Sequence, residues 1–125
     1  MKTQAYQIPA DQCISVTGVS GAIVTATLPA VASQFHYLVG IEITKFFTAA
    51  NAANANPLVT TTTNLPGSLS YSFGQPLGTI GTVDERTYAF AAPIKSSVAG
   101  TSTTISCPAT AGIIWRINVH YYVAP

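Results

Sequence analysis

Apolar and polar residues alternate along much of the chain, and this period of two is the pattern of half-buried β-strands. The longest run covers residues 113–123. Its apolar face consists of Ile113, Trp115, Ile117, Val119 and Tyr121, and its other face of Arg116, Asn118, His120 and Tyr122. A strand this long with one apolar face is expected in the middle of a sheet, because an unpaired apolar edge promotes aggregation.

The same alternation predicts shorter strands earlier in the chain, at residues 13–17, 22–28, 36–46, 58–63, 68–73, 86–91 and 101–107. Their expected inward residues are Val24, Ala26 and Leu28; Tyr37, Val39, Ile41 and Ile43; Leu69, Tyr71 and Phe73; Tyr88 and Phe90; and Thr103, Ile105 and Cys107. In the strand at residues 36–46 this assignment places His36 on the opposite, half-exposed face.

Turn residues punctuate these strands, and helix-favouring residues are scarce. Residues 50–57 and 74–85 are predicted to be exposed loops. The pattern as a whole predicts an all-β protein, a jelly-roll-like or Greek-key β-sandwich of about eight strands. The 125 residues suit a single domain, in which residues 1–12 are expected to form an extended N-terminal arm.

Charge is the unusual part of the composition, because only 7% of the residues are Asp, Glu, Lys or Arg, against about 25% in ordinary soluble domains. Neutral polar residues must therefore cover most of the surface. Interface cores are depleted in charge, so this composition favours a protein that works inside an assembly. A secreted, Thr-rich β domain with a neutral polar coat is the alternative.

The sequence argues against nucleic-acid and membrane partners. The net charge is +1 and the Lys and Arg residues are scattered, whereas binding to phosphates needs clustered cations. No stretch approaches the roughly 18 to 20 apolar residues of a membrane helix, and the first residues lack the apolar region of a secretory signal. Folding in the cytosol is therefore expected, with Cys13 and Cys107 reduced and buried; a bridge between them is the alternative for an exported chain.

Groups that could perform catalysis are few. Asp84 and Glu85 are adjacent in a predicted loop beside Arg86, which is typical of a solvated charge cluster. The two histidines and two cysteines lie far apart and have no metal-site spacing. No enzymatic activity, cofactor or metal is predicted. The consecutive pairs Phe46–Phe47 and Tyr121–Tyr122 must each turn one aromatic ring outward, which favours an interaction surface.

The C-terminal half resembles a recurrent pattern in tailed-phage capsid decoration, or cement, proteins. In that pattern a Phe–x–x–Pro–(Leu/Ile)–(Lys/Arg) step precedes a Gly-containing turn, a Thr- and Ile-rich strand, a Thr–x–Gly turn and a long strand that closes on an aromatic residue. The matching residues are Phe90, Pro93, Ile94, Lys95, Gly100, Ile105, Cys107, Thr110, Gly112 and Tyr122. Residues 36–46 are similar to the preceding central strand, whereas Tyr121 stands where the pattern usually has Gly.

The resemblance implies a structural virion protein that sits as a homotrimer on the outside of a phage head and bridges major capsid subunits, after assembly in the host cytoplasm. The residues expected to make the contact are Tyr6, Ile8, Arg116, His120 and Tyr122. The alternative function is a β-sandwich of a phage tail, neck or fibre that binds a host glycan or receptor. Such a site would lie near aromatic residues such as Tyr71 or Tyr88.

Overall fold

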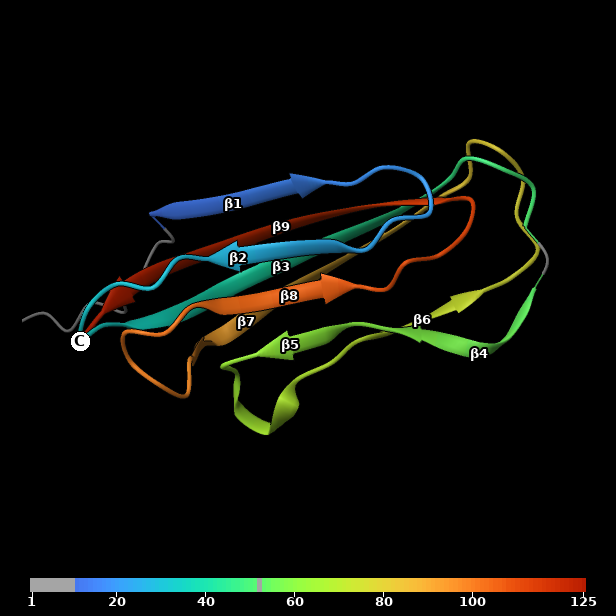
Figure 1. The fold of residues 1–125 in the computed structure, drawn as a ribbon. Helices are drawn as coiled ribbons and strands as arrows, with labels where there is room; N and C mark the ends of the chain where they lie inside the picture. The colour runs from blue at the N-terminus through green and yellow to red at the C-terminus, as the bar shows by residue number, and fades with distance from the viewer. Residues whose placement is uncertain (1–10, 52) are drawn as a thin grey trace, which may run out of the picture.

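The computed structural model describes residues 11–51 and 53–125. These residues form the strands of Figure 1 and one short 3-10 helix. The elements are β1 (Gln12–Thr17), β2 (Val24–Leu28), β3 (Phe35–Phe47), β4 (Asn54–Val59), β5 (Thr61–Thr63), η1 (Pro66–Ser68), β6 (Ser72–Gln75), β7 (Val83–Lys95), β8 (Thr103–Cys107) and β9 (Ile113–Ala124). The all-β fold class is confirmed.

The strands pack as two antiparallel layers. A four-stranded sheet has the order β1-β9-β3-β7, and a three-stranded sheet, β2-β8-β5, lies against it (Figure 1). The predicted strand at residues 58–63 is interrupted at Thr60, so that β4 pairs with β6 while β5 pairs with β8. When β4 and β5 are taken as one interrupted strand, the pairing order is that of a jelly roll.

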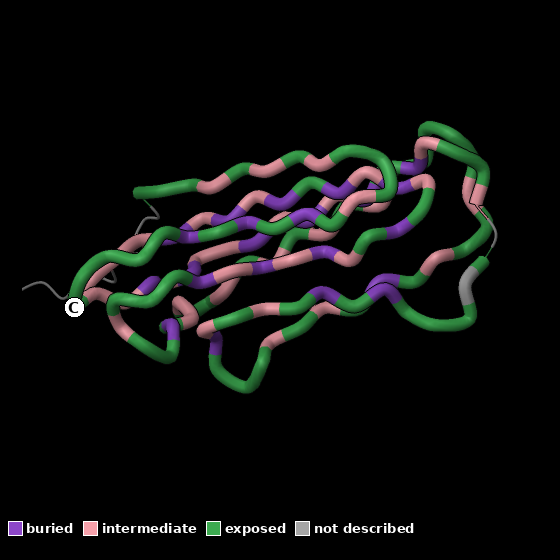
Figure 2. Tube along the Cα trace, in the orientation of Figure 1, coloured by how far each residue is buried: buried purple, intermediate pink, exposed green. Residues whose placement is uncertain are grey.

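The core lies between the two layers. Figure 2 shows buried residues alternating with more exposed ones along the strands, as the sequence pattern predicted. The inward residues of β2, β8 and β9 are those expected, and β9 lies between β1 and β3. Trp115 is fully buried, and its indole packs edge to face on Phe73 with ring centroids 5.3 Å apart.

The predicted face of β3 is correct in its second half and wrong in its first half. The register with β9 shifts between Leu38 and Gly40, so Val39 is an extra residue in the ladder. One extra residue moves the preceding side chains to the opposite face. His36 and Leu38 therefore point into the core, and Tyr37 points outward.

Several predicted boundaries and exposures also differ. The predicted loop at residues 50–57 contains the start of β4, which pairs Asn54 with Gln75. The predicted loop at residues 74–85 is shorter, because β6 continues to Gln75 and β7 starts at Val83. In the predicted strand at residues 68–73, Ser68 ends η1 and residues 69–71 are irregular, although Leu69 and Tyr71 pack on the core as expected.

The two cysteines are free. Cys107 is buried as predicted, whereas Cys13 is exposed because β1 is an edge strand and this residue faces outward on it. Most of the predicted N-terminal arm, with Tyr6 and Ile8, lies outside the described residues.

Candidate functional site

The four-stranded sheet has one face turned away from the three-stranded sheet, and we name this side the open sheet face. No strand among residues 11–51 and 53–125 packs on it. The cross-strand registers assign its residues: Cys13, Ser15 and Thr17 of β1; Ile114, Arg116, Asn118, His120 and Tyr122 of β9; Phe35, Tyr37, Gly40, Glu42, Thr44 and Phe46 of β3; and Val83, Glu85, Thr87, Ala89 and Lys95 of β7.

The charged residues of the described chain are confined to this sheet. All of them lie on β3, β7 or β9, except Asp11, which directly precedes β1. Glu42, Glu85, Lys95 and Arg116 point toward the open sheet face, so two acids are balanced by two bases there. The sequence between Thr17 and Ile41, and again between Phe46 and Val83, contains no ionisable acid, Lys or Arg. The three-stranded sheet therefore presents an uncharged outer surface.

A small polar cluster occupies the middle of the open sheet face. His120 Nε2 lies 3.5 Å from Glu42 Oε1, and Asn118 Nδ2 donates a hydrogen bond to Glu42 Oε2 over 3.3 Å. Both side chains of the His–Glu pair remain about a third or more exposed, so the pair contributes little stability. The cluster fixes the carboxylate on β3 beside the imidazole of β9 and leaves both accessible to a partner.

Aromatic rings gather at the end of the open sheet face nearest the C-terminus. Tyr37 and Tyr122 are cross-strand partners whose rings stack in parallel, with centroids 4.9 Å apart. Lys95 Nζ lies 4.0 Å from the ring centroid of Phe35. Such cation–π and aromatic contacts on a sheet surface combine apolar area with positive charge, as protein-binding surfaces do.

The structure confirms that the predicted contact residues of the last strand point outward together. Arg116, His120 and Tyr122 occupy alternate positions of β9 on the open sheet face. Tyr122 lies six positions after Arg116, a span of about 20 Å at the usual rise of a strand. Their role in a contact stays a prediction, and Tyr6 and Ile8 lie outside the described residues.

Sequence reasoning missed Tyr37 and Glu42 as neighbours of these residues. The bulge at Val39 places Tyr37 on the outward face instead of the inward one, and the alternation of apolar and polar residues does not predict the bulge. The outward position of Glu42 could have been predicted, because Glu42 lies between the buried Ile41 and Ile43 on the same strand.

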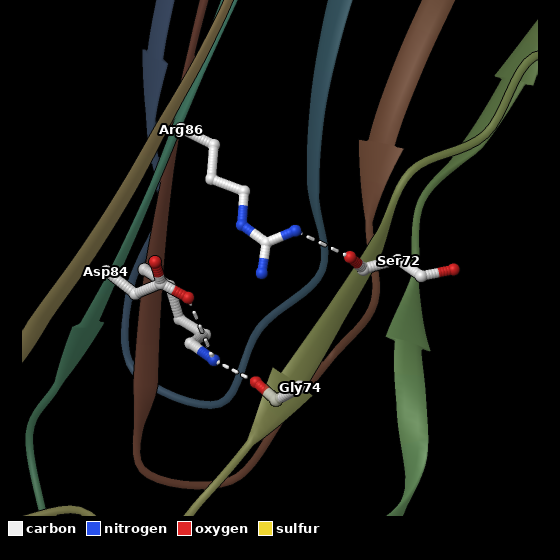
Figure 3. A network of polar contacts seen from close by, with 5 residues as sticks. Ser72, Gly74, Asp84 and Arg86 are labelled. Atoms are coloured by element: carbon white, nitrogen blue, oxygen red, sulfur yellow. Dashed lines mark hydrogen bonds and ion pairs between the residues drawn. The ribbon is translucent and has the colours of Figure 1, made fainter.

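A second charged group lies between the layers rather than in a loop (Figure 3). Asp84 and Arg86 of β7 lie on the inward side of the sheet with Lys45 of β3, while Glu85 lies on the outward side. The Asp84 carboxylate is directed at Lys45 and the Arg86 guanidinium at the Ser72 carbonyl. Lys45 is fully buried; its Nζ lies 3.7 Å from Asp84 Oδ2 and donates to the carbonyl of Gly74. Burial lowers the pKa of Lys45, and the nearby Asp84 carboxylate opposes that effect.

Arg86 completes this arrangement. Its Nη1 donates to the carbonyl of Ser72 over 2.9 Å, and its guanidinium lies 4.6 Å from the ring centroid of Phe73. The two cations thus hold the backbone of β6 to the four-stranded sheet. The predicted loop position of Asp84 and Glu85 beside Arg86 is wrong, because all three residues belong to β7. Asp84 keeps 38% of its side chain exposed and Glu85 is exposed, so the cluster is solvated in part. The contacts of Lys45 and Arg86 with the backbone of β6 give this charged group a structural role.

Tyr71 and Tyr88, the residues expected near a glycan site, stack on each other with ring centroids 3.9 Å apart. Desolvation by burial raises the pKa of Tyr71, and neighbouring Tyr88 adds to the rise. Each ring therefore covers one face of the other, and only the remaining faces could contact a sugar.

His36, weighed in the sequence as a half-exposed residue, is buried and used in packing. Its Nε2 donates to the carbonyl of Pro29 over 2.8 Å, and its Nδ1 lies 2.7 Å from Thr103 Oγ1. With both ring nitrogens engaged, His36 ties β3 to β8 and to the end of β2. It is not available as a surface base.

Within the described part of the chain, no three His, Cys, Asp or Glu side chains come close enough to bind a metal ion. None of the described helices has the length and apolar character needed to cross a membrane. No family model matches the chain, and no curated protein matches it.

Proposed function

We propose that this chain is a structural, non-enzymatic protein of a phage particle, a decoration protein that binds the exterior of the head and bridges major capsid subunits. The observation that supports it best is the open sheet face. This face combines all the outward-pointing charge of the described strands with partly exposed aromatic rings, and no described strand covers it. Tyr and Arg are the residue types enriched where protein partners bind.

The proposed mechanism is clamping by several weak contacts. A homotrimer would present three copies of the open sheet face to neighbouring shell subunits, and linked contacts bind far more firmly than one contact alone. Arg116 and Lys95 would orient each copy against acidic groups of the shell. Aromatic side chains such as Tyr122 would supply apolar contact area.

Binding to heads assembled without this chain tests the proposal. We expect the purified chain to co-sediment with such heads, and Arg116→Glu to weaken binding at least about tenfold, because reversing a contact charge commonly costs more than about 1.4 kcal/mol. Arg116 is exposed, and its side chain makes a long hydrogen bond to Ser15 and no other among residues 11–51 and 53–125, so the variant should fold.

Thr27→Glu is the control, because Thr27 is exposed on the outer surface of β2, in the other layer. It should bind like the unsubstituted chain. Failure of the chain to bind heads, or equal loss with both variants, would refute docking through the open sheet face. Binding to a glycan array that Tyr88→Ala abolishes, without head binding, would instead establish the tail or fibre alternative.

A further inference from the structure

One end of the sandwich exposes large aliphatic side chains. It is the end farthest from the C-terminus, where the β1–β2, β3–β4, β6–β7 and β8–β9 connections meet (Figure 1). Leu77 is 78% exposed, Ile80 72%, Val19 70% and Ile23 63%. We name this the apolar end; it comprises Val19, Ile23, Leu77 and Ile80 of the connections, and it borders Phe46 and Val83 of the open sheet face.

Hydrogen bonds between the connections hold this end together. Gly21 N donates to the Ile113 carbonyl, and Thr48 N donates to the Gly112 carbonyl over 2.8 Å. Gly81 N donates to the Phe47 carbonyl, and Ser20 Oγ lies 2.6 Å from Thr48 Oγ1. The exposed side chains are therefore carried on loops that are fixed to one another, so a partner would pay little ordering entropy there.

The apolar end contains no ionisable acid, Lys or Arg. Such residues are absent from the connections at residues 18–23, 48–53, 76–82 and 108–112. The charged residue nearest in the sequence is Asp84, which is 38% exposed and pairs with the buried Lys45. A monomer seldom leaves a contiguous apolar patch open without using it. Among interfaces, those between identical subunits are the most apolar and the poorest in charge.

We infer that copies of this chain associate through their apolar ends. A second copy fits better than a membrane surface, because loops that insert into anionic lipid are usually flanked by cations, and these connections have none. Two uncharged ends also meet without electrostatic repulsion. The inference rests on the proposed function only for the expected number of three copies.

Sedimentation velocity of the full chain from micromolar to millimolar concentration tests this inference without any phage head. We expect a reversible oligomer that Leu77→Ser combined with Ile80→Ser dissociates. Burying one Leu or Ile side chain is worth at least about tenfold in affinity, so the double variant should weaken association roughly 100-fold. Far-ultraviolet circular dichroism should show an unchanged fold, because both side chains are exposed.

Val31→Ser combined with Val98→Ser is the matched control, since both residues are exposed apolar residues at the opposite end. It should associate like the unsubstituted chain. A chain that stays monomeric at every concentration, or an oligomer that survives the Leu77 and Ile80 changes, would overturn the inference. A monomer that co-sediments with phosphatidylcholine vesicles would also overturn it and assign the end to lipid. Self-association is measured without phage heads, and head binding is measured in a separate experiment. Failure of one proposal can therefore be distinguished from failure of the other.

Discussion

Among single residues, the buried Cys107 thiol makes stability sensitive to alkaline pH. It lies on β8, opposite Val24 of β2, in the core. Burial raises the pKa of Cys107 from 9.0 to about 12. Between these two values the folded chain keeps the proton that the unfolded chain loses, so each step upward in pH favours unfolding.

We therefore predict that the free energy of unfolding falls as pH rises above 9, by at most about 1.4 kcal/mol per pH unit from this thiol. Urea denaturation in reducing buffer measures it. Tyr71 and Tyr121, whose pKa values are also raised by burial, act in the same direction at higher pH, whereas the lowered pKa of Lys45 acts in the opposite one. Cys107→Ala should flatten the decline; an equally steep decline in that variant would contradict the assignment.

At the scale of elements, the connection from β1 to β2 depends on a residue without a side chain. Gly18 N donates to the Trp115 carbonyl over 2.9 Å, which ties the connection to β9. A Cβ at this position would lie 2.1 Å from Val24 Cγ2. Val24 is buried, and its branched side chain is stiff, so the neighbour has little freedom to move.

Gly18→Ala should accordingly destabilise the protein by about 1–3 kcal/mol, the usual cost of overpacking. Thermal and urea unfolding measure the difference. Gly74→Ala is the comparison, because a Cβ at Gly74 meets no heavy atom within 4 Å. If the two variants lost similar amounts of unfolding free energy, the close approach of Gly18 to Val24 would not be the reason for glycine at this position.

The strands could be predicted from the sequence wherever one alternating pattern ran without interruption. In β9, apolar side chains fill one face from end to end, so the facing of Tyr121 and Tyr122 was predictable. In β3, the extra residue Val39 moves the side chains that precede it to the opposite face, and the sequence pattern gives no sign of this change. Strand register depends on contacts with distant segments, and local alternation cannot reveal them.

The candidate interface was predictable only in part, because local alternation gives the outward residues of a strand but not the strands beside it. The outward residues of β9 follow from its alternation, but their neighbours come from β3 and β7, distant in the sequence. Lys45 was discoverable as an inward cation, because it continues the alternation of Ile41 and Ile43. Its partner Asp84 was not, since the sequence placed that residue in a loop.

At the scale of the whole molecule, charge divides the sandwich into two unlike sides. The four-stranded sheet carries the charged residues of the described chain except Asp11, and the outer surface of the three-stranded sheet is uncharged. The apolar end joins the two sides. This division suits a protein whose orientation in an assembly is fixed, because charged and uncharged surfaces would meet different neighbours.

Hydroxyl-radical footprinting is the sharpest test of docking through the open sheet face, with the chain free in solution and then bound to heads that were assembled without it. We expect Tyr37, His120 and Tyr122 of the open sheet face to lose reactivity on heads, while Val59, an exposed residue of β4 outside the four-stranded sheet, keeps its own. Unchanged reactivity at the open sheet face in the presence of heads, or protection confined to the three-stranded layer, would contradict docking through this face.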